Sequence, residues 1–239
     1  MKSARSKKHM TKSSGRCLEV DKYILCFIGM AGGRSNREVD TRRKQVQRRS
    51  RPQKIKQKIE EKRVFHNSTD GKKVRLMFQD EAGFGRINKP KYCWCQKGIR
   101  PSVPCHHIRE YRYAYGAVEP MTGESFFLVM PYCNTDCMNL FLRELSNEYK
   151  NDMVILVCDG ARWHTSNGLQ IPDNIELLFI PPYTPEMNPI EQIWEEIREK
   201  GFRNECFQTL DMVVDRLCDT ICSLTSDTIM SITHREWIC

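Results

Sequence analysis

The segment MVILVCD, residues 153–159, gives the clearest indication of the fold. Its six consecutive apolar residues, half of them Val or Ile, are typical of a strand that is covered on both faces of a sheet. A second apolar run, IELLFI at residues 175–180, follows after about fifteen residues, which is long enough for a crossover between parallel strands. The pair predicts the parallel part of an α/β sheet, with Asp159 at the end of the first strand.

Three strands are predicted ahead of this pair. VRLMFQD, residues 74–80, alternates apolar and polar side chains, and Asp80 is the next residue on its apolar row. YRYAYGAV (111–118) and SFFLVMPY (125–132) are separated by a turn-like insert that favours a hairpin. These segments predict three antiparallel strands.

Helices are predicted from Asn134 or Thr135 to about Tyr149, and from an Asn188 N-cap with Pro189 at the first position to about Lys200. One last helix is predicted from a stripe of apolar residues: Leu210, Val214, Leu217, Ile221 and Leu224. The order of strands and helices predicts a mixed α/β sheet flanked by helices, for which the ribonuclease H-like (retroviral-integrase-like) arrangement is the best-known example.

The charge is divided unevenly along the chain. Residues 1–73 carry 22 Lys and Arg against 7 Asp and Glu, whereas residues 74–239 carry 16 against 23. We expect a basic, partly disordered N-terminal arm over residues 1–73, with one short polar helix near 51–63, and a catalytic domain over residues 74–239. Basic arms bind nucleic acid by neutralising phosphates. Candidate DNA contacts in the short helix are Lys54, Lys56 and Lys58.

Composition also limits the class of protein. The longest apolar runs, Tyr23–Ala31 and Met153–Cys158, are far shorter than the roughly 18 to 20 residues of a membrane span. Twelve cysteines scattered through a chain of this length favour reduced thiols in a cytoplasmic protein, nucleoid-associated if the host is bacterial. A zinc site at Cys93, Cys95, Cys105, His106 and His107 is disfavoured, because C-x-C spacing is tight for a structural zinc.

Three acidic residues occupy chemically suggestive positions: Asp80, Asp159 and Glu191. Each has an ordinary alternative, since Asp80 can mark a strand end, Asp159-Gly160 is a common turn pair, and Glu191 is three residues after a predicted N-cap. Together, two Asp on neighbouring strands and a Glu in the first turn of a helix suit two Mg²⁺ ions about 3.5 to 4 Å apart. Such a pair of ions serves phosphodiester chemistry on nucleic acid.

The blocks FQDEAGFG (78–85), CDGARWHTS (158–166) and PPYTPEMNPIEQIW (181–194) resemble the catalytic domain of DDE transposases of the mariner superfamily, in particular its bacterial insertion-sequence branch. The resemblance spans roughly residues 73–201 and implies that Asp80, Asp159 and Glu191 are the metal-binding catalytic triad.

That resemblance also implies cleavage at transposon ends, followed by attack of the freed 3′-hydroxyl on target DNA. The implied cofactors are two Mg²⁺ ions, with Mn²⁺ as a substitute. The implied partners are DNA and a second copy of the chain, with no membrane and no small-molecule substrate.

The chain departs from the family ahead of the first strand. Transposases of this type carry one or two helix-turn-helix modules there, whereas residues 1–50 show no pair of amphipathic helices, so we expect a truncated DNA-binding region. Two other functions stay open: a catalytically idle DNA-binding remnant, and a ribonuclease H-like nuclease that cuts without strand transfer.

Four other residues have weaker expectations. Arg162 and His164 are candidate DNA contacts in the loop after Asp159, and His164 is alternatively a surface-loop residue or a contact close to the metal. Glu81 points to the strand face opposite Asp80 and is expected to be structural or to support a metal ligand. Trp194 is expected in the core. The last helix is expected to pack on its own domain rather than form a dimer seam.

Overall fold

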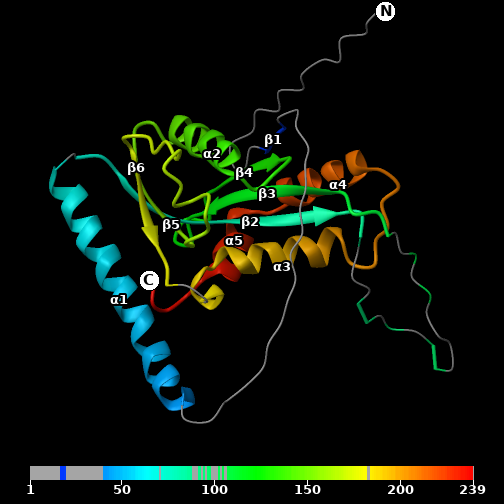
Figure 1. Ribbon diagram of the computed structural model, residues 1–239, viewed down its shortest axis with the longest axis horizontal. Helices are drawn as coiled ribbons and strands as arrows, with labels where there is room; N and C mark the ends of the chain where they lie inside the picture. Colours follow the sequence, from blue (N-terminus) through cyan, green and yellow to red (C-terminus); the bar gives the residue numbers. More distant parts are fainter. Residues whose placement is uncertain are drawn as a thin grey trace, which may run out of the picture.

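A six-stranded mixed sheet forms the centre of the molecule (Figure 1). The computed structural model describes residues 17–19, 40–69, 71–87, 91–92, 94, 96–97, 102, 104, 107–181 and 184–238. The strands are β1 (Cys17–Glu19), β2 (Val74–Gly85), β3 (Tyr111–Val118), β4 (Ser125–Met130), β5 (Met153–Cys158) and β6 (Ile175–Phe179). Their order is β1-β4-β3-β2-β5-β6. The predicted mixed sheet is confirmed, because β2 is antiparallel to β3 and parallel to β5.

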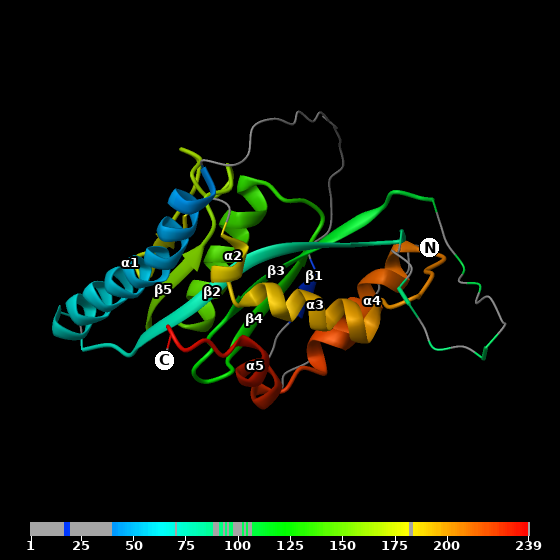
Figure 2. The ribbon, with the colours of Figure 1, turned by 90° about the horizontal axis from the view of Figure 1, so that it is seen from below.

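Helices cover both faces of this sheet, as Figures 1 and 2 show. On one face lies α2, and on the other lie the three C-terminal helices. The helices are α1 (Asp40–Thr69), α2 (Thr135–Glu148), α3 (Ile190–Gly201), α4 (Leu210–Cys222) and α5 (Ser226–Thr233), with a short 3₁₀ turn, η1 (Pro185–Met187), before α3. The sheet therefore separates two apolar layers.

The alternation of side chains along β2 builds both layers. Leu76 and Phe78 enter the core beneath α3 and α4, whereas Met77 enters the core beneath α2. Trp194 is only 1% exposed in the first of these cores, as predicted. Buried residues of α4, among them Leu217 and Ile221, belong to the same core, so the apolar stripe packs on its own domain as predicted.

The N-terminal helix is longer than the sequence predicts. It begins at Asp40 rather than near residue 51, and its Ile55 and Ile59 are 3% and 5% exposed because the sheet core receives them. Lys62 and His66 then contact Glu176 of β6. The short strand β1 was also not expected within residues 1–50. The division of the chain at residue 73 stays a prediction, although α1 packs on the catalytic core.

Two further expectations concern the ends of the sequence. The apolar stripe of residues 210–224 forms one helix, as predicted, although α4 ends at Cys222 and Leu224 lies beyond it. A further helix that the sequence did not reveal, α5, follows, and Thr225 caps it by accepting from the backbone N–H of Thr228. The expected disorder before residue 40 falls outside the described residues apart from β1, as do four of the five residues weighed for zinc. Among the residues that the structure describes, no helix is long and apolar enough to span a membrane.

Gly116 of β3 makes room for Trp194. It lies opposite Asp80 in the β2–β3 register, and a Cβ atom there would lie 2.7 Å from Trp194 Cη2 and 2.6 Å from Phe127 Cε1. Gly116→Ala is therefore expected to lower the free energy of unfolding by about 1–3 kcal/mol, because both rings must shift. Urea denaturation measures this change. In Gly168→Ala the new Cβ meets nothing closer than 3.7 Å, so equal losses in the two variants would contradict the packing explanation.

Candidate active site

Asp80 and Asp159 each lie two residues beyond the last register pair of two neighbouring parallel strands. That pair is Phe78 with Val157, so continuing the register would set Asp80 level with Asp159. The prediction that Asp80 marks a strand end is wrong: β2 continues to Gly85, paired with β3, while its pairing with β5 stops at Phe78. Asp80 therefore lies in a part of β2 that is still paired with β3 but no longer with β5. The side of the strand that β5 leaves is available to the two carboxylates.

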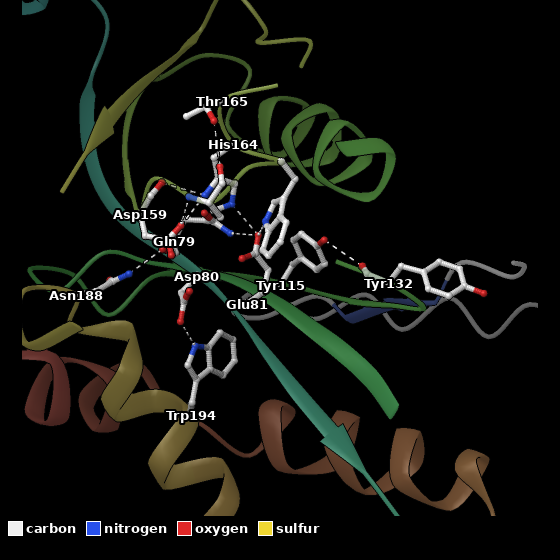
Figure 3. A network of polar contacts seen from close by, with 12 residues as sticks. Gln79, Asp80, Glu81, Tyr115, Tyr132, Asp159, His164, Thr165, Asn188 and Trp194 are labelled. Atoms are coloured by element: carbon white, nitrogen blue, oxygen red, sulfur yellow. Dashed lines mark hydrogen bonds and ion pairs between the residues drawn. The ribbon is translucent and has the colours of Figure 1, made fainter. Parts of the chain in front are cut away.

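The Asp80 carboxylate is mostly buried and has an anchor from α3. Trp194 Nε1 donates to Asp80 Oδ2 at 3.0 Å, a contact that the sequence did not reveal (Figure 3). Burial, followed by the negative charges of Glu191 and Glu81, raises the pKa of Asp80 to about 7. The site thus concentrates negative charge that lacks a cationic partner on the Asp80 side.

The Asp159 carboxylate is held by its own loop. Its Oδ1 accepts from the backbone N–H of Ala161 at 2.9 Å and lies 2.9 Å from His164 Nδ1. Half of the side chain stays exposed. The hydrogen bond from His164 is the main reason that the pKa of Asp159 is lowered, so this carboxylate is ionised at neutral pH.

His164 itself is buried, which corrects both its surface-loop reading and its DNA-contact reading. Its side chain is fully covered, and its second ring nitrogen, Nε2, lies 2.9 Å from Glu81 Oε1. Burial alone lowers the pKa of His164, but the hydrogen bonds to Asp159 and Glu81 outweigh it and raise the pKa to about 10. The charged ring lies between the carboxylates of Asp159 and Glu81. Glu81 thus has a structural role, as predicted.

Glu191 reaches the site from the first turn of α3. The predicted side-chain cap at Asn188 is wrong: the N-cap residue is Pro189, without a side-chain cap hydrogen bond. Asn188 Nδ2 instead donates to the backbone oxygen of Gln79, next to Asp80, at 2.9 Å. Asn188 therefore fixes the start of the helix to β2, which sequence reasoning missed because the two residues are far apart in the chain.

Charge interactions link the three carboxylates in pairs. Glu191 raises the pKa of Asp80, and burial followed by the charges of Glu195 and Asp159, against Arg198, raises the pKa of Glu191. Glu191 thus affects Asp80 and Asp159 affects Glu191, whereas a metal site shared by all three carboxylates stays a prediction. Within the described residues, however, no group of three or more His, Cys, Asp or Glu side chains is arranged so that it could hold a metal ion.

The donor atoms of the site fit a hard, hydrated cation. Asp80, Asp159 and Glu191 offer carboxylate oxygens, the ligands that Mg²⁺ and Mn²⁺ prefer. Two buried acceptors beside them, Gln79 Oε1 and Asn188 Oδ1, have no hydrogen-bond donor in the described part of the protein. Water molecules of a hydrated cation are donors, so such a cation would satisfy atoms that are costly to leave unpaired.

The remaining predicted residues lie on exposed surfaces. Arg162 is exposed in the loop after Asp159. On α1, Lys54, Lys56 and Lys58 are all exposed, and helical geometry puts Lys54 and Lys58 on the same side with Lys56 on another. The structure therefore does not gather these four side chains with the carboxylates into one cluster.

The sheet order and its flanking helices define a ribonuclease H-like fold, as predicted. The Mos1 strand transfer complex has this fold with a TM-score of 0.60 at 16% identity, over 87% of this chain and 62% of that one. A Mos1 mariner paired-end complex with Mg matches with a TM-score of 0.56 at 15% identity, over 88% and 63%. The chain thus spans less than two thirds of these Mos1 chains.

Residues 75–214 match the family described as DDE superfamily endonuclease, and the chain belongs to this family. A relative in Sinorhizobium fredii (strain NBRC 101917 / NGR234), the uncharacterized protein y4pE/y4sA, is 38% identical over 130 residues, which is 53% of this chain and 96% of the relative. The predicted DDE family is confirmed, whereas placement in the bacterial insertion-sequence branch stays a prediction.

The charge coupling between Asp80 and Glu191 can be tested without metal. Glu191→Gln removes a negative charge from the site, so the pKa of Asp80 is expected to fall from about 7 towards the ordinary value of a carboxyl. Carboxyl-carbon NMR titration measures this. Glu196→Gln is the matched control, since Glu196 lies on the same helix and pairs with Lys200. An Asp80 pKa that responds equally to both variants would show that Glu191 is not its neighbour.

Proposed function

We propose that this chain is a divalent-metal-dependent DNA transposase. It cleaves phosphodiester bonds at the ends of a mobile element and joins the freed 3′-hydroxyl ends to target DNA. The observation that carries the proposal is the position of Asp80 on β2 and of Asp159 after the neighbouring strand β5, with Glu191 on α3 coupled by charge to Asp80, within a chain of the DDE superfamily endonuclease family. Three carboxylates from three elements suit metal-assisted phosphoryl transfer better than they suit any structural role.

Asp80, Asp159 and Glu191 would hold two Mg²⁺ ions, for which Mn²⁺ can substitute. When bound, the ions would supply a stronger attacking oxygen and stabilise the leaving oxygen. The chain's own residues prepare that site. Trp194 orients Asp80, and Asn188 fixes the start of the helix that carries Glu191. The raised pKa of Asp80 implies that cation binding displaces a proton, so Mn²⁺ affinity is expected to fall as the pH drops below about 7.

DNA is the proposed substrate and partner. The fold is shared with Mos1 proteins whose structures are described as a strand transfer complex and a paired-end complex. We propose that this chain likewise binds paired DNA ends, and that it does so as a homodimer. Arg162, in the same loop as Asp159, and the exposed lysines of α1 are the proposed phosphate contacts.

The catalytic assignment predicts loss of both reactions in single carboxylate variants. With Mg²⁺ and DNA carrying the element ends, taken from the sequence that flanks the gene, the chain is expected to nick the ends and join them to a target duplex. Asp80→Asn, Asp159→Asn and Glu191→Gln are each expected to reduce cleavage and joining to background, because each removes an ionised ligand. Gel electrophoresis of labelled ends measures both steps.

The same gels provide the control and distinguish the other candidate functions. Asp173→Asn changes an exposed carboxylate in the turn before β6 and is expected to retain full activity. Cleavage without joining would favour a nuclease, and DNA binding without cleavage would favour an idle remnant. Full activity in Asp159→Asn would contradict the catalytic assignment itself.

A second prediction concerns the basic helix. Lys54→Ala with Lys58→Ala is expected to weaken binding to duplex DNA of any sequence and to reduce the slope of log affinity against log salt by about 2, one for each phosphate contact. Fluorescence anisotropy over a salt series measures this. Arg143→Ala with Lys150→Ala removes two exposed charges on and after α2 and serves as the control. An equal loss in both double variants would argue against a specific role for α1.

A further inference from the structure

The strand β2 carries a second carboxylate with a different environment from that of Asp80. Glu81 follows Asp80 directly, so the pleat turns its side chain to the other face of the sheet. There the carboxylate is only 4% exposed. Its Oε1 accepts from Gln79 Nε2 at 3.0 Å and from Trp163 Nε1 at 3.2 Å, and it lies 2.9 Å from His164 Nε2. Glu81 is thus an acceptor on which two residues of the Asp159 loop converge.

His164 carries this connection on to Asp159. Its Nδ1 lies 2.9 Å from Asp159 Oδ1 and 3.0 Å from the Asp159 backbone oxygen, so one ring contacts both the side chain and the main chain of that residue. With Nε2 on Glu81, both ring nitrogens face acceptors (Figure 3). A ring held at both nitrogens and fully buried has one orientation. The chain of contacts therefore runs from β2 through Glu81 and His164 to Asp159.

The geometry points to Glu81 and His164 as a positioning pair that sets the orientation of Asp159 for cation binding. This inference rests on the proposed function, because it assigns Asp159 to the cation. Two donors, the Ala161 N–H and His164 Nδ1, fix Oδ1, which leaves Oδ2 as the oxygen assigned to the cation. Glu81 and His164 touch neither substrate nor cation in this arrangement and act only through Asp159.

The arrangement explains why an anchor is needed at Asp159. Asp80 is part of a strand that continues to Gly85, so ladder hydrogen bonds with β3 fix its backbone. Asp159 follows the last residue of β5 and opens a connection without regular structure up to β6, with half of its side chain exposed. The same strand, β2, thus positions Asp80 directly and Asp159 through the Glu81–His164 pair. Ligands that are fixed by surrounding contacts bind cations more tightly than mobile ligands do.

Two substitutions of one residue separate positioning from simple loss of the histidine. In His164→Asn the amide nitrogen can take the place of Nδ1 and donate to Asp159, whereas in His164→Gln it takes the place of Nε2 and faces Glu81. Mn²⁺ binding to the full chain, measured by electron paramagnetic resonance without DNA, is expected to weaken about 10- to 100-fold in His164→Gln. His164→Asn is expected to weaken binding less, because it keeps the donor to Asp159 and loses only the contact with Glu81. Equal affinities in two folded variants would overturn the proposal.

Controls address folding and general effects of losing a His–Glu contact. Thermal unfolding of each variant checks that the two are compared as folded proteins. His66→Gln removes the other buried histidine that contacts a glutamate, His66 with Glu176 between α1 and β6, and is expected to leave Mn²⁺ affinity unchanged. Should either His164 variant fail to fold, Glu81→Gln takes its place, since it keeps the shape and an acceptor oxygen but loses the charge. Unchanged Mn²⁺ affinity in Glu81→Gln would equally overturn the proposal.

Asp159→Asn distinguishes failure of this inference from failure of the proposed function. If Asp159→Asn abolishes Mn²⁺ binding while both His164 variants bind as the unchanged chain does, the cation site stands and the positioning pair is wrong. If Asp159→Asn binds Mn²⁺ normally, the cation site itself is wrong, and the positioning pair falls with it. The expected pattern is no binding in Asp159→Asn, weak binding in His164→Gln and intermediate binding in His164→Asn.

Discussion

The parallel pairing of β2 with β5 is the constraint on which the site depends. Its register, continued by two residues, sets Asp80 level with Asp159, and every other part of the site is placed relative to that pair. The pairing lies inside a sheet that α2 covers on one face and α3 and α4 cover on the other, so β5 is apolar throughout and β2 is apolar on the face toward α3 and α4. A slip of one residue in the register would send Asp80 and Asp159 to different levels and faces.

Gathering carboxylates on a sheet has an electrostatic cost, which the surrounding residues reduce unequally. Asp159 is offset by the charged ring of His164, so its pKa is lowered. Asp80 accepts from Trp194 Nε1 and from the backbone N–H of Glu81, but burial and the charges of Glu191 and Glu81 outweigh these hydrogen bonds, so its pKa is raised. Burial raises the pKa of Glu191 as well, although Arg198 opposes this. A bound cation would offset the repulsion around these two carboxylates.

Most of the fold was predictable because its signals are local. The strands β2, β5 and β6 and the cap residue of α2 each follow from a few neighbouring residues, and the structure confirms these elements. However, β6 is an edge strand with Phe179 exposed, not a strand covered on both faces like β5. The errors have long-range causes. Ile55 and Ile59 are too few to predict a buried helix, yet the sheet core receives both. Asn is a common residue type at N-caps, but Asn188 instead donates to the backbone oxygen of Gln79, an acceptor that local sequence cannot reveal.

The sequence by itself determined the family, the order of strands and helices, and the three carboxylates proposed for catalysis, since these depend on residue type and spacing along the chain. Only the tertiary structure decided how those carboxylates are held. Trp194 lies over Asp80 because Gly116 leaves space opposite it, and His164 is buried between Glu81 and Asp159 because β2 and the loop after β5 pack together. Contacts between residues about eighty or more positions apart form only when the sheet assembles, and no local pattern encodes them.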